Sequence, residues 1–289
     1  MVNTESTQDT SLDELMAEGP PGLWKREGVR SSAIATLSTV IVFGGIITLV
    51  VTSPNWDRVK AQFFSREDFI DSWPRVLKGF WINLELFAYS TVSVAILALL
   101  IAVMRSLRGP AFTPLRIMAT VYTDLFRGIP LVLLIYLIGF GLPALQIQGL
   151  TNSAKFWGIV AMTLSYSAYT AEIYRSGIDA VPESQRSSAR ALGLTQWQSL
   201  RFAILPQAIR NVIPALMNTV VSLQKDVALL SILGIREAVR EADIYKGRTF
   251  NYTSYIAATV LFLLISIPLT RYVDWFTARD RRRRSQAPV

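Results

Sequence analysis

Hydrophobic residues gather in six long runs that are separated by polar segments. The runs cover residues 33–52, 80–104, 117–140, 156–175, 208–235 and 253–273. Each is near the length that a helix needs to cross a bilayer, about 20 residues at 1.5 Å per residue. The first run is too long and too far from the start for a cleaved signal peptide. The pattern therefore predicts an all-α membrane protein with six transmembrane helices.

The polar segments divide the chain into four predicted parts. Residues 1–30 contain a Gly-Pro-Pro-Gly stretch and read as a loosely ordered cytoplasmic tail. Residues 31–79 hold the first transmembrane helix and an external loop, and 80–275 form the main transmembrane domain. Residues 276–289 form a basic cytoplasmic tail.

Composition supports the membrane prediction and excludes several kinds of chemistry. Hydrophobic residues make up 51% and charged residues 17% of the chain, and the mean hydropathy is +0.36, which is too apolar for an ordinary soluble protein. Cysteine and histidine are absent, so thiolate or imidazole metal sites and His-dependent nucleophiles are excluded. A phosphate-binding Gly-Lys-Ser/Thr loop is also absent. We therefore expect no catalytic residues, no metal site and no cofactor bound by this chain.

Basic residues predict how the helices are oriented. The net charge is +8, and most of the excess lies in segments 105–116 and 176–207 and in the tail, which short-loop counting places in the cytoplasm. Six spans then put both termini in the cytoplasm. The loop at 53–79 fits less well, because it holds five basic residues yet should be external. We read the charge as a topology signal that favours contact with membrane lipid rather than nucleic acid.

Residues 182–206 form a polar, arginine-rich segment between two apolar runs. Pro182 suits the first turn of a helix, Gly193 suits a left-handed position after its end, and Thr195 with Gln198 forms a capping box that starts a second helix. Pro206 then ends that helix or starts the next. The segment predicts two short amphipathic helices that another protein grips. Their apolar face is Ala189, Ala191, Leu192 and Leu194, and their basic face is Arg186, Arg190 and Arg201. A helix-turn-helix DNA reader is the alternative, which the flanking membrane helices disfavour.

This spacing resembles the coupling loop of importer-type ABC permeases. Ala189, Gly193, Leu205 and Pro206 fit the family pattern, whereas Ser187 and Ser188 stand where the family has Glu and Ala. The chain also resembles the polar amino acid permease branch of this family over roughly residues 76–275. The sequence segments that carry this resemblance are LFRGIPLVLLIYLIGFGLP at 125–143, AYTAEIYRSGI at 168–178 and SLQKDVALLSILGI at 222–235.

The resemblance implies a five-helix permease core to which the first helix is an addition. It implies a bacterial inner (plasma) membrane protein that pairs with a second permease subunit, identical or different. Each permease would contact one copy of an ABC ATPase dimer, which holds ATP and Mg²⁺, through the six coupling residues Ser187, Ser188, Ala189, Gly193, Leu205 and Pro206. An extracellular or periplasmic binding protein would deliver the substrate.

Charged residues within the predicted spans are the candidates for the substrate pathway, because each is costly at membrane depth. Arg127 precedes Gly128 and Pro130, which can break the helix, and its guanidinium suits a carboxylate. Lys225 and Asp226 lie deep in the fifth run and point about a quarter turn apart. Glu172 is the fourth candidate. The structural alternative is that Asp124–Arg127 and Glu172–Arg175 are ion pairs one helical turn apart.

The function that we predict from the sequence is that of a non-enzymatic permease subunit of an amino acid importer. The resemblance implies that the substrate is a polar amino acid. Glutamate or glutamine is the first hypothesis, because Arg127 and Lys225 could serve a second acidic or amide group. A self-sufficient proton-coupled carrier that uses Glu172 or Asp226 is the alternative, and a structural membrane scaffold is a more distant one.

Overall fold

The computed structural model describes residues 27–107 and 109–285. The predicted N-terminal tail therefore lies outside the described residues, apart from its last four. Helices account for nearly all of the described chain, and no strand occurs within it. The described part divides into two compact units, which meet between Ala61 and Gln62.

The first unit contains the helix α2 (Glu27–Val51) and most of α3 (Trp56–Phe63). Between Ser31 and Val51, α2 contains an 18-residue stretch with a mean hydropathy of 2.4, and every side chain of this span is exposed. A helix that is apolar all round is suited to a bilayer. This is the additional N-terminal helix that the first apolar run predicts.

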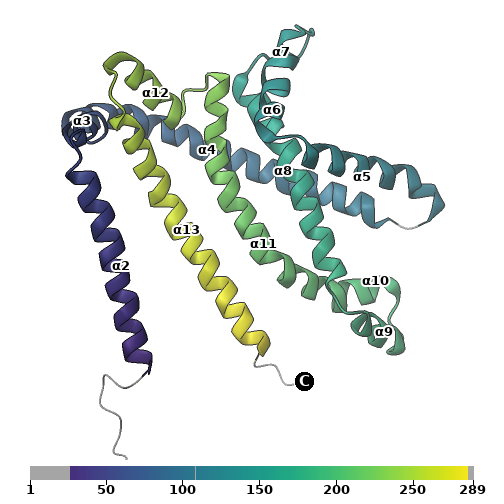
Figure 1. Ribbon diagram of the computed structural model, residues 1–289. Coiled ribbons are helices and arrows are strands. Elements are labelled where there is room, and N and C mark those ends of the chain that lie inside the picture. Colours follow the sequence, from purple (N-terminus) through teal and green to yellow (C-terminus); the bar gives the residue numbers. More distant parts are fainter. Residues whose placement is uncertain (1–26, 108, 286–289) are drawn as a thin grey trace, which may run out of the picture. The chain divides into compact units, whose positions relative to one another are not determined.

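The second unit is built around two long helices (Figure 1). Helix α4 (Arg66–Ser106) has 41 residues, about 60 Å of helix, and begins at Ser65, whose hydroxyl accepts from the backbone of Asp68. Helix α8 (Ala154–Asp179) packs against it. The segment that was expected to form a loop before residue 80 is therefore mostly helical, because the Ser65 cap starts α4 fourteen residues before the apolar run.

The apolar run at 117–140 does not form one straight helix. Helix α5 (Thr113–Gly128) ends at the Gly-Ile-Pro sequence, and α6 (Leu131–Tyr136) follows. A π-helical turn (Leu137–Gly141) and α7 (Leu142–Ala144) complete the segment. The bend between the two parts is 105°. Pro130 cannot donate a backbone hydrogen bond and restricts Ile129 to an extended conformation, so the helix stops where the sequence predicted a break.

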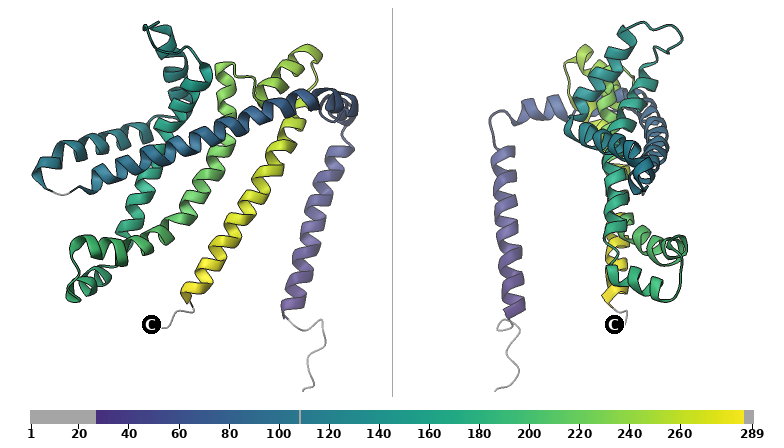
Figure 2. Two further views of the ribbon diagram at one scale, coloured as in Figure 1. Left: turned by 180° about the vertical axis from the view of Figure 1, so that it is seen from behind. Right: turned by 90° about the vertical axis from the view of Figure 1, so that its right-hand side faces the viewer.

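The C-terminal part contains the remaining long helices. After α9 (Glu183–Ala191) and α10 (Gln196–Gln198), a π-helical segment (Ser199–Ile204) continues into α11 (Leu205–Asp226), which tightens to a 3₁₀ segment at Val227–Leu233. Helices α12 (Ala238–Thr249) and α13 (Thr253–Ser285) follow, so the start of the predicted basic tail is helical. Within the second unit, α9, α10 and the end of α13 lie at one end, and α7 and α12 lie at the other (Figure 2).

Four helical segments of the described chain are long and apolar enough to span a membrane, or five if the bent α5–α7 segment counts as one. Helix α8 is the predicted span that does not meet this criterion. Eleven of its residues are buried against other helices, so its polar residues need not contact lipid. The all-helical membrane fold is confirmed, and the count of six spans stays a prediction.

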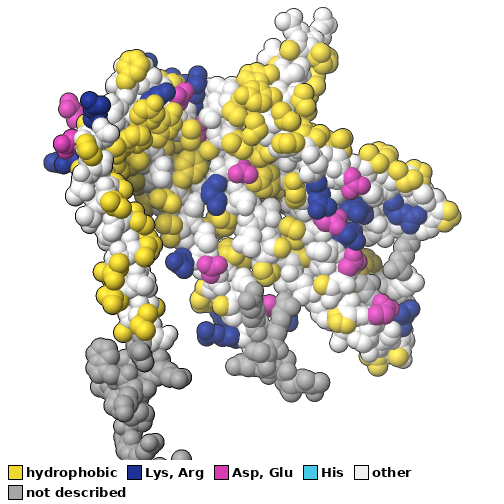
Figure 3. All heavy atoms as spheres, in the orientation of Figure 1, with side chains coloured by type: hydrophobic (Ala, Val, Ile, Leu, Met, Phe, Trp, Pro, Cys, Tyr) yellow, Lys and Arg dark blue, Asp and Glu magenta, His cyan; other side chains and the backbone are white. Residues whose placement is uncertain are grey.

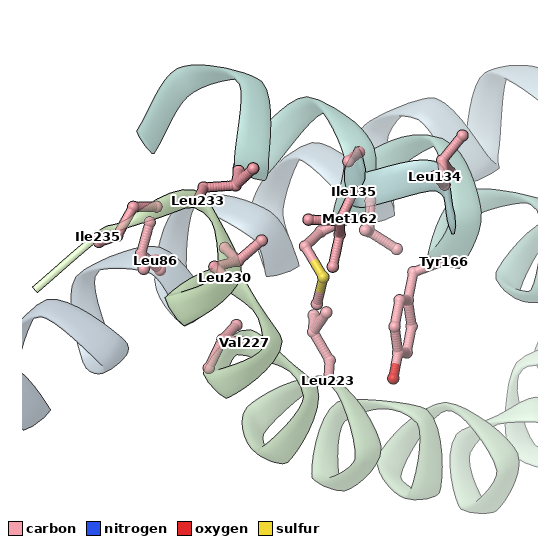
Figure 4. Close-up of a cluster of buried hydrophobic side chains, with 12 residues drawn as sticks. Leu86, Leu134, Ile135, Met162, Tyr166, Leu223, Val227, Leu230, Leu233 and Ile235 are labelled. Carbon is pink, nitrogen blue, oxygen red and sulfur yellow. The ribbon is translucent and has the colours of Figure 1, made fainter. Parts of the chain in front are cut away.

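The main core lies where α4, α6, α8 and α11 meet. Leu86, Ile135, Met162 and Leu223 are almost completely buried there (Figure 4). Tyr166 lies at the edge of this cluster, with its hydroxyl pointing toward α11. A second cluster joins α4 to α12 and α13. These contacts fix α8 and α11 next to each other, and the functional residues lie along that contact.

Candidate functional site

A cavity of about 780 Å³ lies between α8, α11 and the bend that follows α5. Gly128, Ile129 and Pro130 form one wall, so backbone groups freed by the helix break face a hollow. Such groups are tolerated at membrane depth only inside protein or next to water. The remaining wall carries polar side chains from Ser165, Tyr169, Ser176, Asn218, Thr219 and Ser222, beside the apolar Leu131 and Ile173.

Three of the four predicted pathway residues line this cavity. Arg127 enters from α5, Glu172 from α8 and Asp226 from the last turn of α11. Lys225 is exposed and does not line it. Successive helical residues point about 100° apart, so Asp226 can face the cavity while its neighbour faces elsewhere. Arg127 and Lys225 therefore do not line the same cavity, and the hypothesis that both serve one substrate stays a prediction.

Arg127 lines the cavity beside Tyr169. The guanidinium carbon is 5.7 Å from the centre of the Tyr169 ring, within the range of a cation–π contact. The Tyr169 hydroxyl in turn donates to the Arg127 carbonyl oxygen at 3.0 Å. Among the described ion pairs, none joins Arg127 to Asp124, so the structural alternative of a pair within α5 is not realised. The charge of Arg127 is thus held in place without a carboxylate partner.

Asp226 is positioned by a single neutral partner. The Tyr166 hydroxyl donates to Asp226 Oδ2 at 2.6 Å, and no described cation forms an ion pair with this carboxylate. Tyr166 is itself fixed in the main core. The cavity therefore presents one guanidinium and one carboxylate whose charges no other side chain neutralises. An arrangement of this kind can bind a zwitterion, because each charged group of the ligand finds an opposite charge.

Glu172 is different, because two arginines neutralise it. Arg105 Nη1 of α4 lies 2.6 Å from Glu172 Oε2, and Arg175 pairs with the other carboxylate oxygen. Arg175 also bonds Asp179 at 2.8 Å. Charged side chains gather along this part of α8 (Figure 3). The pair Glu172–Arg175 that the spacing indicated is confirmed, and the contact to Arg105, 67 residues earlier in the chain, was not foreseen.

The segment 182–206 has most of the predicted geometry. Gly193 has φ = +78°, in the left-handed region, and Thr195 and Gln198 form both hydrogen bonds of the capping box. Pro182 precedes the first turn of α9 as its cap, and Pro206 lies in the first turn of α11. The second helix does not end there, because the π-helical residues carry it directly into α11.

The predicted apolar face of this segment is divided. Ala189 is buried, whereas Leu192 is 80% exposed and Ala191 is also exposed. The exposed apolar surface instead combines Leu192 with Trp197 and Phe202, which are each about two-thirds exposed. The predicted apolar face did not include these two aromatic residues. The other coupling candidates Ser187, Ser188, Leu205 and Pro206 are exposed as well. Of the predicted basic face, Arg190 pairs with Glu183 and Arg201 lies over Phe202, and the Arg186 side chain is outside the described residues.

A buried carboxylate at the other end of the unit was also not foreseen. Glu237 caps α12 by accepting from the backbone of Val239 and Arg240, and Asn83 of α4 donates to it at 2.8 Å. Burial raises the pKa of Glu237. Gly79 of α4 permits this contact, because a Cβ there would lie 2.7 Å from the Glu237 carbonyl carbon. Nothing in the local sequence distinguishes this glutamate from surface ones, so only the packing identifies it.

Residues 96–282 match the model of a family described as the inner membrane component of binding-protein-dependent transport systems. The arginine transport system permease protein ArtQ of Bacillus subtilis (strain 168) is 34% identical over 198 residues, which are 67% of this chain and 87% of that protein. A putative glutamine transport system permease protein of Rickettsia felis is 32% identical over 70% of this chain and 92% of its own length.

Solved structures give the same fold. A crystal structure described as an amino acid ABC transporter with histidines has a TM-score of 0.67 and 31% identity, and the match covers 73% of this chain and 96% of that one. The methionine transporter MetNI in an inward-facing conformation has a TM-score of 0.57 at 19% identity, over 71% and 96% of the two chains. This second likeness concerns the fold alone.

Proposed function

Because this chain belongs to the family of inner membrane components of binding-protein-dependent transport systems, we propose that it forms the pathway of an ATP-driven importer for a polar amino acid. The prediction of an importer-type ABC permease is confirmed by that membership. The observation that carries the proposed substrate class is the cavity with Arg127 and Asp226 on its wall. Amino acid permeases and an amino acid transporter among the similar proteins support it.

In the proposed binding mode, the substrate is held by the two groups that all amino acids share. The Arg127 guanidinium binds the α-carboxylate, for which its planar fork of donors is suited. Asp226, held by Tyr166, binds the α-ammonium group. Hydroxyl and amide groups of Ser222, Thr219 and Asn218 remain for a polar side chain.

The charge of the cavity favours a neutral side chain over an acidic one. Arg127 is the one cationic residue among those that line it, Asp226 is acidic, and Glu172 is already paired with Arg105 and Arg175. A substrate carboxylate beyond the first would meet no second cation, since Lys225 lies outside the lining. Of the two first hypotheses we therefore propose glutamine rather than glutamate, in keeping with the glutamine-named relatives.

In this proposal, ATP hydrolysis by a partner protein drives transport through contacts with the segment 182–206. The chain has no phosphate-binding loop of its own, and the segment exposes Leu192 at the end of α9, Trp197 in α10 and Phe202 in the π-helical residues that follow. An ABC ATPase dimer that holds ATP and Mg²⁺ would grip this surface from the cytoplasm, where we place both termini. A second permease subunit and an extracellular or periplasmic binding protein complete the proposed complex.

The binding mode is tested by replacing Arg127 with Met in the complex reconstituted with its ATPase and binding protein. Loss of a charge-assisted hydrogen bond should lower glutamine uptake by about 10- to 100-fold while leaving basal ATP hydrolysis and assembly unchanged. The matched control is Asp124→Asn, on the same helix but outside the cavity lining, and it should transport normally. Equal uptake by Arg127→Met and the control would refute the assigned role, and uptake without ATPase would favour the proton-coupled carrier.

The coupling surface is tested at Gly193, which adopts φ = +78° in open space. A Cβ there has no atom within 4 Å, so we expect the effect of valine to come from the left-handed backbone, which costs a β-branched residue about 1–2 kcal/mol. Gly193→Val should displace α9 and reduce uptake together with substrate-stimulated ATP hydrolysis. Asn tolerates this conformation, so Gly193→Asn should retain both. Normal coupled transport by the valine variant would contradict the role of this segment.

A further inference from the structure

A second, wholly apolar hollow lies between α11 and α13, away from the polar cavity. Its volume is about 290 Å³. The α11 side contributes Ile213, Leu216, Met217 and Val220, and the α13 side contributes Leu269, Tyr272 and Val273. We refer to these seven residues as the α11–α13 groove. The proposed transport mechanism does not use it.

The composition of the groove argues against a tightly packed protein helix as its occupant. Helices that approach each other closely in membranes do so through small residues, and this chain follows that rule elsewhere. Gly177 of α8 faces Val212 of α11 so closely that a Cβ at that glycine would overlap the valine side chain. The groove instead has large branched or flexible side chains and no glycine, alanine or serine. Such a surface suits a chain that adapts its shape, such as a fatty-acyl chain.

Two stacked aromatic residues lie between the groove and a cationic residue of α13. Tyr272, within the groove, stacks on Trp275 with ring centres 6.0 Å apart, and the Arg279 guanidinium carbon lies 5.2 Å from the centre of the Trp275 ring. All three lie along one face of α13, so the apolar groove is followed by two aromatic residues and then by a cationic one. This is the order of side chains that crosses from hydrocarbon to lipid headgroups.

The other side of the groove also has a cation at that end. Arg210 of α11 is exposed and lies one turn before Ile213. The start of α11 and the end of α13 lie at the same end of the second unit (Figure 2). Basic residues between membrane helices at the cytoplasmic side attract anionic headgroups. A second copy of this chain is a poorer fit, because a two-fold contact here would bring two sets of arginines together.

We propose that the α11–α13 groove binds one acyl chain of an anionic phospholipid, whose headgroup lies against Arg279 and Arg210. The site requires only that the chain is inserted in a membrane. It does not depend on which amino acid is transported.

Native mass spectrometry of the purified transporter complex, supplied with phosphatidylglycerol and phosphatidylcholine, tests this proposal. The wild type should retain phosphatidylglycerol in preference to phosphatidylcholine. Val220→Trp fills the groove and should abolish the retained lipid, whereas Leu264→Trp, which changes an exposed residue of α13 outside the groove, should leave it. Arg279→Gln should lower the preference for phosphatidylglycerol about fivefold. Arg248→Gln, at an exposed position of α12, should leave that preference unchanged.

Three results would overturn the proposal. Val220→Trp could retain as much phosphatidylglycerol as Leu264→Trp, or Arg279→Gln could keep the wild-type preference. Alternatively, Val220→Trp could release a permease subunit from the complex and leave the lipid bound, which would make the groove a protein interface. Arg279 is near the end of α13 and outside the core clusters, so its variant remains informative if the tryptophan variant fails to fold.

Discussion

Helix α11 borders two hollows of opposite character. Asn218, Thr219, Ser222 and Asp226 face the cavity, whereas Ile213, Leu216, Met217 and Val220 face the α11–α13 groove. At about 100° per residue these two sets lie on roughly opposite faces of one helix. The comparison teaches that membrane depth alone does not decide whether a polar residue is tolerated. What decides is whether other polar groups lie opposite the face that carries it, as they do in the cavity and do not in the α11–α13 groove.

The cavity itself contains two kinds of charge. Among the residues that the structure describes, Arg127 and Asp226 form no ion pair, whereas Glu172 forms two. The charged groups of a substrate can pair with Arg127 and Asp226. Glu172 already pairs with Arg105 and Arg175, so a substrate ammonium group would gain little by binding it. We therefore assign Glu172 to the stability of the α4–α8 contact rather than to substrate binding.

The largest effect on stability should follow from Glu172→Gln. The side chain of Arg105 is only 17% exposed. When Glu172 no longer carries a carboxylate, the largely buried charge of Arg105 loses this partner. Breaking a fully buried pair costs about 3–5 kcal/mol, and partial exposure here reduces the expected loss to about 2 kcal/mol. Denaturant unfolding of the detergent-solubilised protein measures it. The double variant Arg105→Met, Glu172→Gln should recover most of the stability, and a failure to recover would mean that Glu172 acts elsewhere.

The smallest effect should follow from Lys225→Met. Lys225 is exposed, lies outside both hollows and forms no described ion pair. Its removal should change the free energy of unfolding by less than about 0.5 kcal/mol and leave glutamine uptake within about twofold of the wild type. Asp226→Asn is the matched comparison one residue later, for which uptake should fall sharply. If the two variants lost uptake equally, the distinction between cavity and surface at this turn would be wrong.

Local sequence rules predicted the features that depend on a few neighbouring residues. The break after Arg127 follows from Gly128 and Pro130, the left-handed Gly193 from the absence of a side chain, and the capping box from Thr195 and Gln198. The apolar runs predicted the long helices, and motif resemblance predicted the permease family. Each of these depends on backbone geometry or on hydrophobic length, which residues close in sequence determine.

Tertiary structure decided which of the charged residues share a site. Arg127, Glu172 and Asp226 come from three helices and line one cavity, while Lys225 and Asp124, each within three residues of a cavity residue, do not. The Arg105–Glu172 pair, the Asn83–Glu237 hydrogen bond and the α11–α13 groove likewise join residues that are 49 to 154 positions apart. Helical periodicity gives the direction of a side chain around its own helix. It does not determine which neighbouring helix that direction meets, because that depends on how all the helices pack together.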